Sequence, residues 1–132
     1  MLRGLGPQCR VLAVPSGLGI GGRCALSGLP EPLLLDAAHI VPDADEALEQ
    51  PVVRNGLPLS KADHAAFDAH LVGIDLDHRI HVSDKLMAQQ DGPTLDAIKR
   101  LHLSMLCPPA RPQDAPDRDR LALRFEQFRK AA

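Results

Sequence analysis

A short apolar run flanked by prolines limits what the first half of this chain can fold into. The run, Leu33 to Ile40, is eight residues long, with Pro32 before it and Pro42 after it. Proline lacks a backbone N–H and interrupts both helices and central strands. A buried strand fits within this length, whereas a helix usually needs about ten residues or more. The run therefore predicts a short buried strand.

The residues that follow predict a loop, a second strand and a helix. Residues 41–54 are rich in acidic side chains and predict a loop. Asn55-Gly56 is a turn signal, and residues 57–59 suit a short edge strand. Ser60 has the position of an N-cap, so a helix from about residue 61 to residue 70 is expected after it.

The second half of the chain predicts a β-hairpin and two helices. Apolar residues alternate in 72–76 and 80–82 around an Asp77-His78 turn, which is typical of a hairpin. A helix with an apolar stripe from Leu95 to Met105 is expected after Pro93. The whole chain is thus assigned to the α+β class. The predicted organisation is an irregular Gly-rich segment at 1–22, one domain at 23–106, a Pro-rich linker at 107–116 and a C-terminal helix at 117–132.

Composition limits the functional class. With three Phe and no Trp or Tyr, the chain lacks the aromatic platforms that bind single strands by base stacking. Cys9, Cys24 and Cys107 form no Cys-x-x-Cys pair, so neither a structural zinc nor a disulfide framework is expected. A reducing cytoplasm is the simplest compartment. No apolar run has the length of a membrane span, and no membrane partner is expected.

Charge is spread unevenly along the chain. Residues 1–98 hold 7 basic and 13 acidic side chains, whereas residues 99–132 hold 8 basic and 4 acidic ones. An acidic half can hold a divalent cation, and a basic tail can contact phosphates. Ordinary solvated surface charge is nevertheless the simpler explanation of the count alone.

Candidate chemical groups gather in the predicted strand–loop–strand–helix segment. His39 lies near the end of the first strand, Asn55 opens the turn, and His64 is on the first turn of the helix, with Asp68 four residues later on the same face. Phosphodiester hydrolysis needs a base that activates water, a cation that stabilises charge, and groups that hold both. This segment offers a candidate for each role.

These residues resemble those of a known family. The segments Ala37-Ala38-His39-Ile40-Val41-Pro42, Asn55-Gly56-Leu57-Pro58-Leu59-Ser60 and His64-Ala65-Ala66-Phe67-Asp68 are similar to the HNH endonucleases. They are most similar to the restriction endonuclease branch of that family, which lacks zinc-binding Cys pairs. The resemblance extends over roughly residues 23–130. It implies a ββα-metal core, followed here by the predicted hairpin and two C-terminal helices, and DNA as the substrate.

The resemblance also implies roles for the candidate residues. His39 would be the general base, Asn55 would orient it or hold the loop, and His64 would bind a divalent cation, Mg²⁺ or Mn²⁺. Asp68 is a candidate second ligand. Because the chain offers little surface for reading a long site, a homodimer is a further expectation.

Two positions depart from the family pattern. Ala38 stands where many HNH sites place a metal-binding Asp or His, and Asp63 stands where a second His is expected beside His64. Asp36 is the nearest carboxylate on the strand, but regular alternation places it on the face opposite His39. Either the metal is bound by His64, Asp68 and water, or a bulge turns Asp36 inward.

Each assignment has a structural alternative. His39 can be a core histidine, Asn55 a simple turn residue, and His64 and Asp68 solvated helix residues. At the level of the protein, the alternatives are an HNH-like nucleic-acid-binding module that has lost cleavage and a metal-stabilised interaction module. His70, His78 and His81 are not predicted to form a second metal site, because His81 is expected to face solvent. Cys24 is expected to be a small buried residue.

Overall fold

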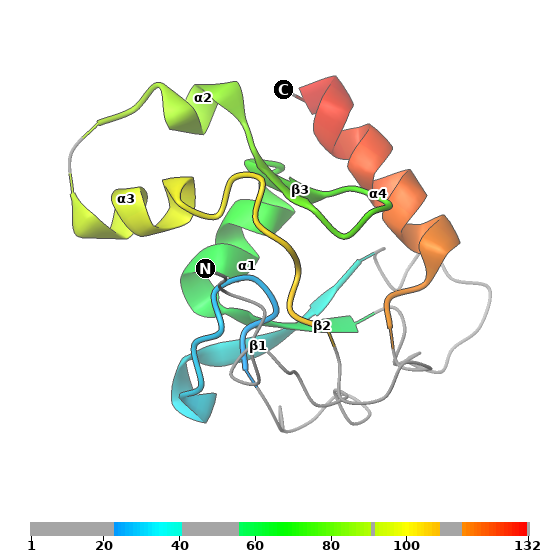
Figure 1. Ribbon diagram of the computed structural model, residues 1–132, viewed down its shortest axis with the longest axis horizontal. Coiled ribbons are helices and arrows are strands. Elements are labelled where there is room, and N and C mark those ends of the chain that lie inside the picture. The colour runs from blue at the N-terminus through cyan, green and yellow to red at the C-terminus, as the bar shows by residue number, and fades with distance from the viewer. Residues whose placement is uncertain (1–22, 41–55, 91, 109–114, 132) are drawn as a thin grey trace.

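The structure, a computed structural model, describes residues 23–40, 56–90, 92–108 and 115–131. Within these ranges, the chain forms two antiparallel hairpins with helices around them, an α+β fold as predicted (Figure 1). In chain order, the elements are the 3₁₀ turn η2 (Pro32–Leu34), β1 (Leu35–His39), β2 (Gly56–Ser60), α1 (Lys61–Asp68), β3 (Val72–Ile74), β4 (Ile80–Val82), α2 (Asp84–Met87), α3 (Pro93–Lys99) and α4 (Arg118–Ala131).

The first hairpin is regular over its whole length. β1 and β2 pair from Leu35 opposite Ser60 to His39 opposite Gly56, one residue against one throughout. The strand starts later than predicted, because Pro32 begins a 3₁₀ turn and the Glu31 carboxylate accepts the N–H of Leu33. Leu33 is 82% exposed, so the expectation of a fully buried run is wrong at its start.

Helix α1 leaves the hairpin without an intervening loop. Ser60 ends β2, and its hydroxyl accepts the N–H of Asp63 at 3.1 Å, which confirms the predicted N-cap. The helix ends at Asp68 rather than at His70, because His70 adopts a φ of 59°. That left-handed conformation cannot continue a right-handed helix. The buried side of α1 carries Phe67, which is fully enclosed.

The second hairpin joins β3 to β4 through a turn that Asp75 stabilises. The Asp75 carboxylate accepts the backbone N–H groups of Asp77 and Arg79 at 2.8 and 3.0 Å. Asp and Asn commonly stabilise turns by accepting hydrogen bonds from nearby backbone amides in this way. The predicted hairpin is therefore confirmed, although β3 ends at Ile74.

Two features of the segment after β4 differ from the prediction. Ser83 caps a short helix, α2, that the sequence pattern did not predict; its hydroxyl accepts the N–H of Leu86. Helix α3 ends at Lys99 instead of extending to Met105. Leu103 has a φ of 67°, and Met105 instead forms a β-bridge with Arg79.

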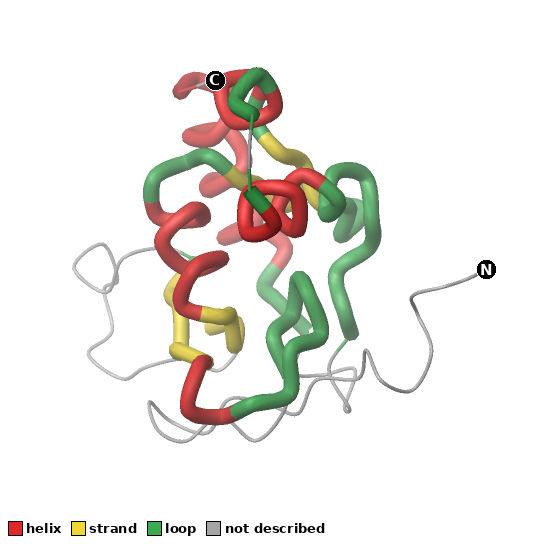
Figure 2. The backbone as a smooth tube through the Cα atoms, turned by 90° about the vertical axis from the view of Figure 1, so that its left-hand side faces the viewer, coloured by secondary structure: helices red, strands yellow, loops and turns green. Residues whose placement is uncertain are grey.

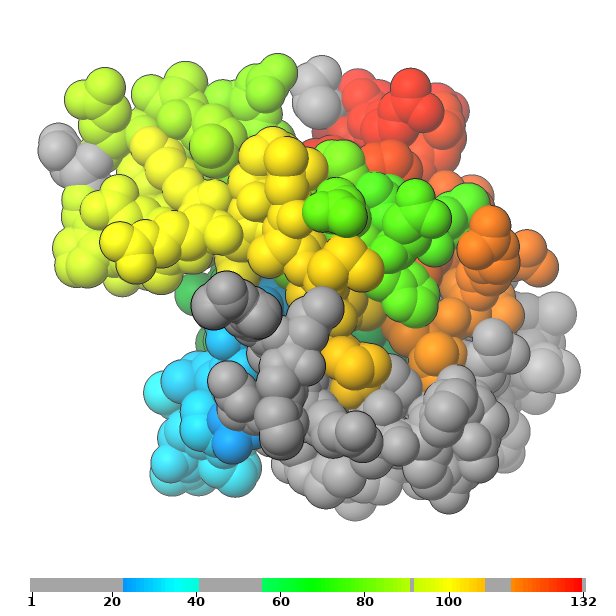
Figure 3. All heavy atoms as spheres, in the orientation of Figure 1, coloured from blue at the N-terminus to red at the C-terminus, as the bar shows by residue number. Residues whose placement is uncertain are grey.

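The predicted C-terminal helix is present as α4 and packs on the second hairpin. A Cβ atom on Gly73 of β3 would lie 2.6 Å from the Phe128 ring, so only glycine permits this close approach. Figures 1 and 2 place α1 between the two hairpins. In the space-filling view, α2 and α3 form one side of the molecule and α4 the other (Figure 3).

One apolar core joins both hairpins, α1 and α4. Its largest fully buried side chains include Phe67, Ile40, Leu59, Ile74 and Leu121. In the described part of the chain, no helix has both the length and the apolar character needed to cross a membrane.

Candidate active site

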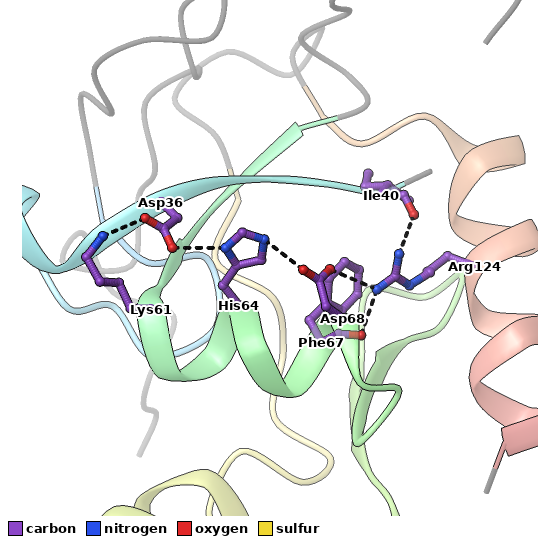
Figure 4. Close-up of polar contacts among 7 residues, drawn as sticks. All are labelled: Asp36, Ile40, Lys61, His64, Phe67, Asp68 and Arg124. Atoms are coloured by element: carbon purple, nitrogen blue, oxygen red, sulfur yellow. Dashed lines mark hydrogen bonds and ion pairs between the residues drawn. The ribbon is translucent and has the colours of Figure 1, made fainter. Parts of the chain in front are cut away.

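His64 is the centre of the site, with a carboxylate on each side of its ring. Its Nδ1 lies 3.0 Å from Asp36 Oδ2, and its Nε2 lies 3.1 Å from Asp68 Oδ2 (Figure 4). Asp36 comes from β1, whereas His64 and Asp68 are separated by one turn of α1. The fold thus brings together all three residues that were predicted as metal ligands.

Asp36 reaches His64 without a bulge in the strand. Alternate residues of β1 and the residue after it share one face of the strand: Asp36, Ala38 and Ile40. On this face, Asp36 contacts His64 of α1, and Ala38 and Ile40 are buried. The sequence left open a bulge that would turn Asp36 toward the site. That expectation is wrong, because the regular strand already directs Asp36 at α1. His39 alternates with these residues, on the opposite face of β1, and is exposed at the end of the strand.

Both carboxylates are also paired with cations on the side away from His64. Lys61 Nζ donates to Asp36 Oδ1 at 2.7 Å, and Arg124 Nη2 donates to Asp68 Oδ1 at 3.3 Å. Hydrogen bonds from His64 and Lys61 hold the pKa of the Asp36 carboxyl below its usual range. The result is a continuous polar chain from Lys61 to Arg124, visible in Figure 4.

The two cations differ in how firmly they are held. The Lys61 side chain is 58% exposed, whereas the Arg124 side chain is 8% exposed. Arg124 also donates to the carbonyl oxygens of Ile40 and Phe67, at 3.1 and 2.7 Å. The lysine can therefore leave its carboxylate at little cost, but the arginine cannot.

The spacing of the donors bears on whether this site suits a divalent cation. Each His64 nitrogen faces a carboxylate oxygen at 3.0 or 3.1 Å, and imidazole nitrogen and carboxylate oxygen are both ligands that divalent cations accept in proteins. The two carboxylates lie on opposite ring nitrogens, so one ion on His64 has only one of them as a neighbouring ligand. Each His64–carboxylate pair would supply two ligands to a cation that keeps several waters.

No larger ligand cluster is present in the part of the chain that the structure describes. Within it, no group of three or more His, Cys, Asp or Glu side chains is arranged to hold a metal ion. A Mg²⁺ ion is commonly held by one or two carboxylates together with waters and substrate phosphates. A pair of protein ligands is therefore compatible with that ion. Asn55 lies outside the described residues, so its predicted role stays a prediction.

Asp63, which departs from the family pattern, has a structural role. Its carboxylate is buried and accepts a hydrogen bond from the Cys24 thiol at 3.3 Å. Burial raises the pKa of Cys24, which is fully enclosed as predicted. The pair ties the segment before β1 to the start of α1, on the buried side of the helix.

A second histidine–carboxylate pair lies on the other hairpin. His81 Nε2 is 2.7 Å from Asp75 Oδ2, and the His81 ring packs against Phe125 of α4 with centroids 5.1 Å apart. The His102 ring meets His81 edge-on at 6.0 Å. The expectation that His81 faces solvent is therefore wrong, because α4 covers this face of β4.

The part of the chain that carries this site matches the model of a known family. Residues 24–75 match the family model described as HNH endonuclease. The matched segment contains β1, β2 and α1 and therefore Asp36, His39, His64 and Asp68. This part of the chain is therefore similar to the HNH endonucleases.

A solved structure has a similar fold. The chain resembles a protein described as "Modification dependent TagI restriction endonuclease", with a TM-score of 0.51 and 21% sequence identity. The similarity covers 80% of this chain and 33% of the other, so the present chain spans about one third of that protein's length. The comparison with curated proteins gave no match.

Proposed function

We propose that this chain is a metal-dependent HNH endonuclease that hydrolyses phosphodiester bonds in DNA. The observation that carries the proposal is the His64 imidazole, held between Asp36 and Asp68 inside the segment that matches the HNH family. The structural relative is described as a restriction endonuclease, and this likeness supports DNA as the substrate. Mg²⁺ or Mn²⁺ is the proposed cofactor, and a homodimer stays a prediction.

His64 and Asp36 are the proposed metal ligands. A dication beside Asp68 would stand next to Arg124, a cation fixed by two carbonyl oxygens and removed from solvent. A dication beside Asp36 would meet only Lys61, whose exposed ammonium can move into water. Electrostatic repulsion therefore favours the Asp36 side, because a permanent buried charge is costly to oppose.

Asp68 then orients His64 rather than binding the cation. Its Oδ2 lies 3.1 Å from His64 Nε2 and accepts the hydrogen bond when that nitrogen carries the proton. A carboxylate on one ring nitrogen fixes the tautomer and leaves the other nitrogen as a ligand. Here the other nitrogen is Nδ1, which faces Asp36.

His39 is the proposed general base. It is exposed at the last position of β1, where solvent and substrate have access to it, and an imidazole near neutral pH can take a proton from water. The cation, when bound, stabilises the negative charge that develops on the phosphate and on the leaving oxygen. The proposed products carry 5′-phosphate and 3′-hydroxyl ends.

Nicking of supercoiled plasmid DNA tests this function. We expect nicking with Mg²⁺ or Mn²⁺, none in EDTA, and a loss of roughly 10²-fold or more in His39→Ala. Metal-dependent nicking that survives His39→Ala would remove His39 as the base. An absence of nicking, together with DNA binding that weakens as salt rises, would instead support a binding module that has lost cleavage.

A further inference from the structure

Arg124 is a buried charge on a helix that lies outside the matched HNH segment. Its residue exposure is 7%, and α4 begins far beyond residue 75, where the family match ends. A buried arginine is rare unless partners satisfy its guanidinium. The partners of Arg124 are therefore informative about its role.

Those partners join the ends of two elements that form the site. Arg124 Nη1 donates to the carbonyl of Ile40, the residue after His39, and Nη2 donates to the carbonyl of Phe67 and to Asp68 Oδ1. The guanidinium also lies 4.1 Å from the centre of the Phe67 ring. One planar group thus binds the C-terminal ends of both β1 and α1, as Figure 4 shows.

The contact with Asp68 connects Arg124 to the centre of the site. Two carbonyl oxygens and an aromatic face would be enough to hold a purely structural arginine in place. Asp68 is 56% exposed and has water available instead, yet one of its oxygens faces Arg124 and the other faces His64. This arrangement fixes the rotation of the carboxylate that holds His64 Nε2.

We propose that Arg124 is a positioning residue of the nuclease site. It acts through Asp68 on the orientation of the His64 ring, and through the Ile40 carbonyl on the strand end that carries His39. This inference rests on the proposed function and extends it: the HNH segment needs α4 to hold its catalytic geometry. Lysine cannot replace Arg124, because an ammonium is a single point charge without the planar fork.

A double-mutant cycle with Mn²⁺ binding as its readout tests the proposal in the full chain. The variants of the cycle are Arg124→Met, Asp68→Asn and their combination. Arg124→Lys is the conservative change. Gln127→Met is the control, because Gln127 is an exposed residue of the same helix. Titration calorimetry without DNA measures the Mn²⁺ affinity, plasmid nicking measures activity, and thermal melting measures the folded fraction.

If Arg124 acts through Asp68, the two single substitutions each weaken Mn²⁺ binding by roughly 10- to 100-fold, and the double variant is no worse than either one. Arg124→Lys does not restore the affinity, and Gln127→Met leaves it unchanged. Additive losses would overturn the proposal. A folded Arg124→Met protein with wild-type Mn²⁺ affinity and nicking rate would overturn it as well.

A second readout separates this proposal from the proposed function. The ring ¹⁵N chemical shifts of His64, recorded without metal, report the environment of Nε2. We expect Arg124→Lys and Arg124→Met to move the Nε2 signal and Gln127→Met to leave it in place. If the wild-type chain neither nicks DNA nor binds Mn²⁺, the proposed function fails, and these shifts still decide the positioning role. An unmoved Nε2 signal in Arg124→Lys would contradict it.

Discussion

The two histidine–carboxylate clusters of this molecule have similar exposure but different surroundings. The His64 side chain is 25% exposed and the His81 side chain 28%, so accessibility does not distinguish them. His64 lies between two carboxylates that come from two elements, each of which also contacts a cation. His81 has one carboxylate, Asp75, and packs against the rings of Phe125 and His102.

This difference supports our proposal that the His64 cluster is the nuclease site and the His81 cluster a structural contact. The Asp75 carboxylate is occupied on its other oxygen by two backbone N–H groups of its own turn, and Phe125 covers the ring from α4. At His64, the facing groups are two carboxylates, Asp36 from β1 and Asp68 from α1. A histidine–carboxylate distance alone therefore does not identify a metal site, and our proposal for His64 depends on the partners of its two carboxylates as well.

The largest expected contrast between the two clusters is in Mn²⁺ affinity when Asp36, Asp68 and Asp75 are each replaced by Asn. Asp36→Asn removes a proposed ligand and should weaken Mn²⁺ binding the most, beyond the roughly 10- to 100-fold loss typical of an orienting partner such as Asp68. Asp75→Asn should leave Mn²⁺ binding unchanged. Calorimetric titration of the three variants measures this order. A greater loss in Asp68→Asn than in Asp36→Asn would place the cation on the other ring nitrogen.

Gly73→Ala tests the structural character of the second cluster. Gly73 pairs with His81 across the hairpin, and an added Cβ would lie 2.6 Å from Phe128. Overpacking of this kind typically costs about 1–3 kcal/mol of unfolding free energy. Urea denaturation should show that loss, while Mn²⁺ affinity per folded molecule stays at the wild-type value. A large change in affinity would show that the two hairpins are coupled.

His81→Ala should cost less, because the ring is partly exposed. Loss of its contacts with Phe125 and of its hydrogen bond with Asp75 should lower the free energy of unfolding by about 1 kcal/mol. The substitution His81→Phe keeps the ring contact and should recover part of that loss. If His81→Ala were as stable as the wild type, the docking of α4 would not depend on this pair.

The smallest expected effect is on stability in acid. Burial raises the pKa of Asp75, but the hydrogen bonds from His81, Arg79 and Asp77 outweigh it and lower the pKa overall; the pKa of Asp36 is lowered as well. A carboxyl with a lowered pKa stabilises the fold above its unfolded-state pKa of about 4 and loses this contribution as the pH falls further. Asp75→Asn and Asp36→Asn should each flatten the decline in urea midpoint below about pH 5. An unchanged decline in both variants would contradict these shifts.

Local pattern was enough to predict the elements that hold the site. The prolines around the first strand, the Ser60 cap and the alternation around Asp75 correctly predicted β1, α1 and the second hairpin. His64 was predicted as a metal ligand, with Asp68 and Asp36 as alternative partners, and the fold brings both carboxylates to His64. Regular alternation correctly placed Asp36 on the face opposite His39. Whether a bulge interrupts β1 depends on its pairing with β2, which spacing alone left open.

Long-range partners were not predictable from local spacing. Arg124 contacts Ile40 and Asp68 across 84 and 56 positions of sequence. One signal was nevertheless present: Arg124 lies three residues after Leu121 and four before Phe128, on the buried side of α4. A charged residue within an apolar helical stripe predicts a buried partner. The solvated assignment of His81 failed for the same reason, because the helix that covers it lies far along the chain.

The most direct test of the proposed nuclease site compares the two histidines as a matched pair. Mn²⁺-dependent nicking of supercoiled plasmid is measured for His64→Ala and His81→Ala, each corrected for its folded fraction. We expect a loss of roughly 100-fold or more for His64→Ala and a rate close to that of the wild type for His81→Ala. Undiminished nicking by His64→Ala, or equal losses in the two variants, would contradict the assignment of the His64 cluster as the nuclease site.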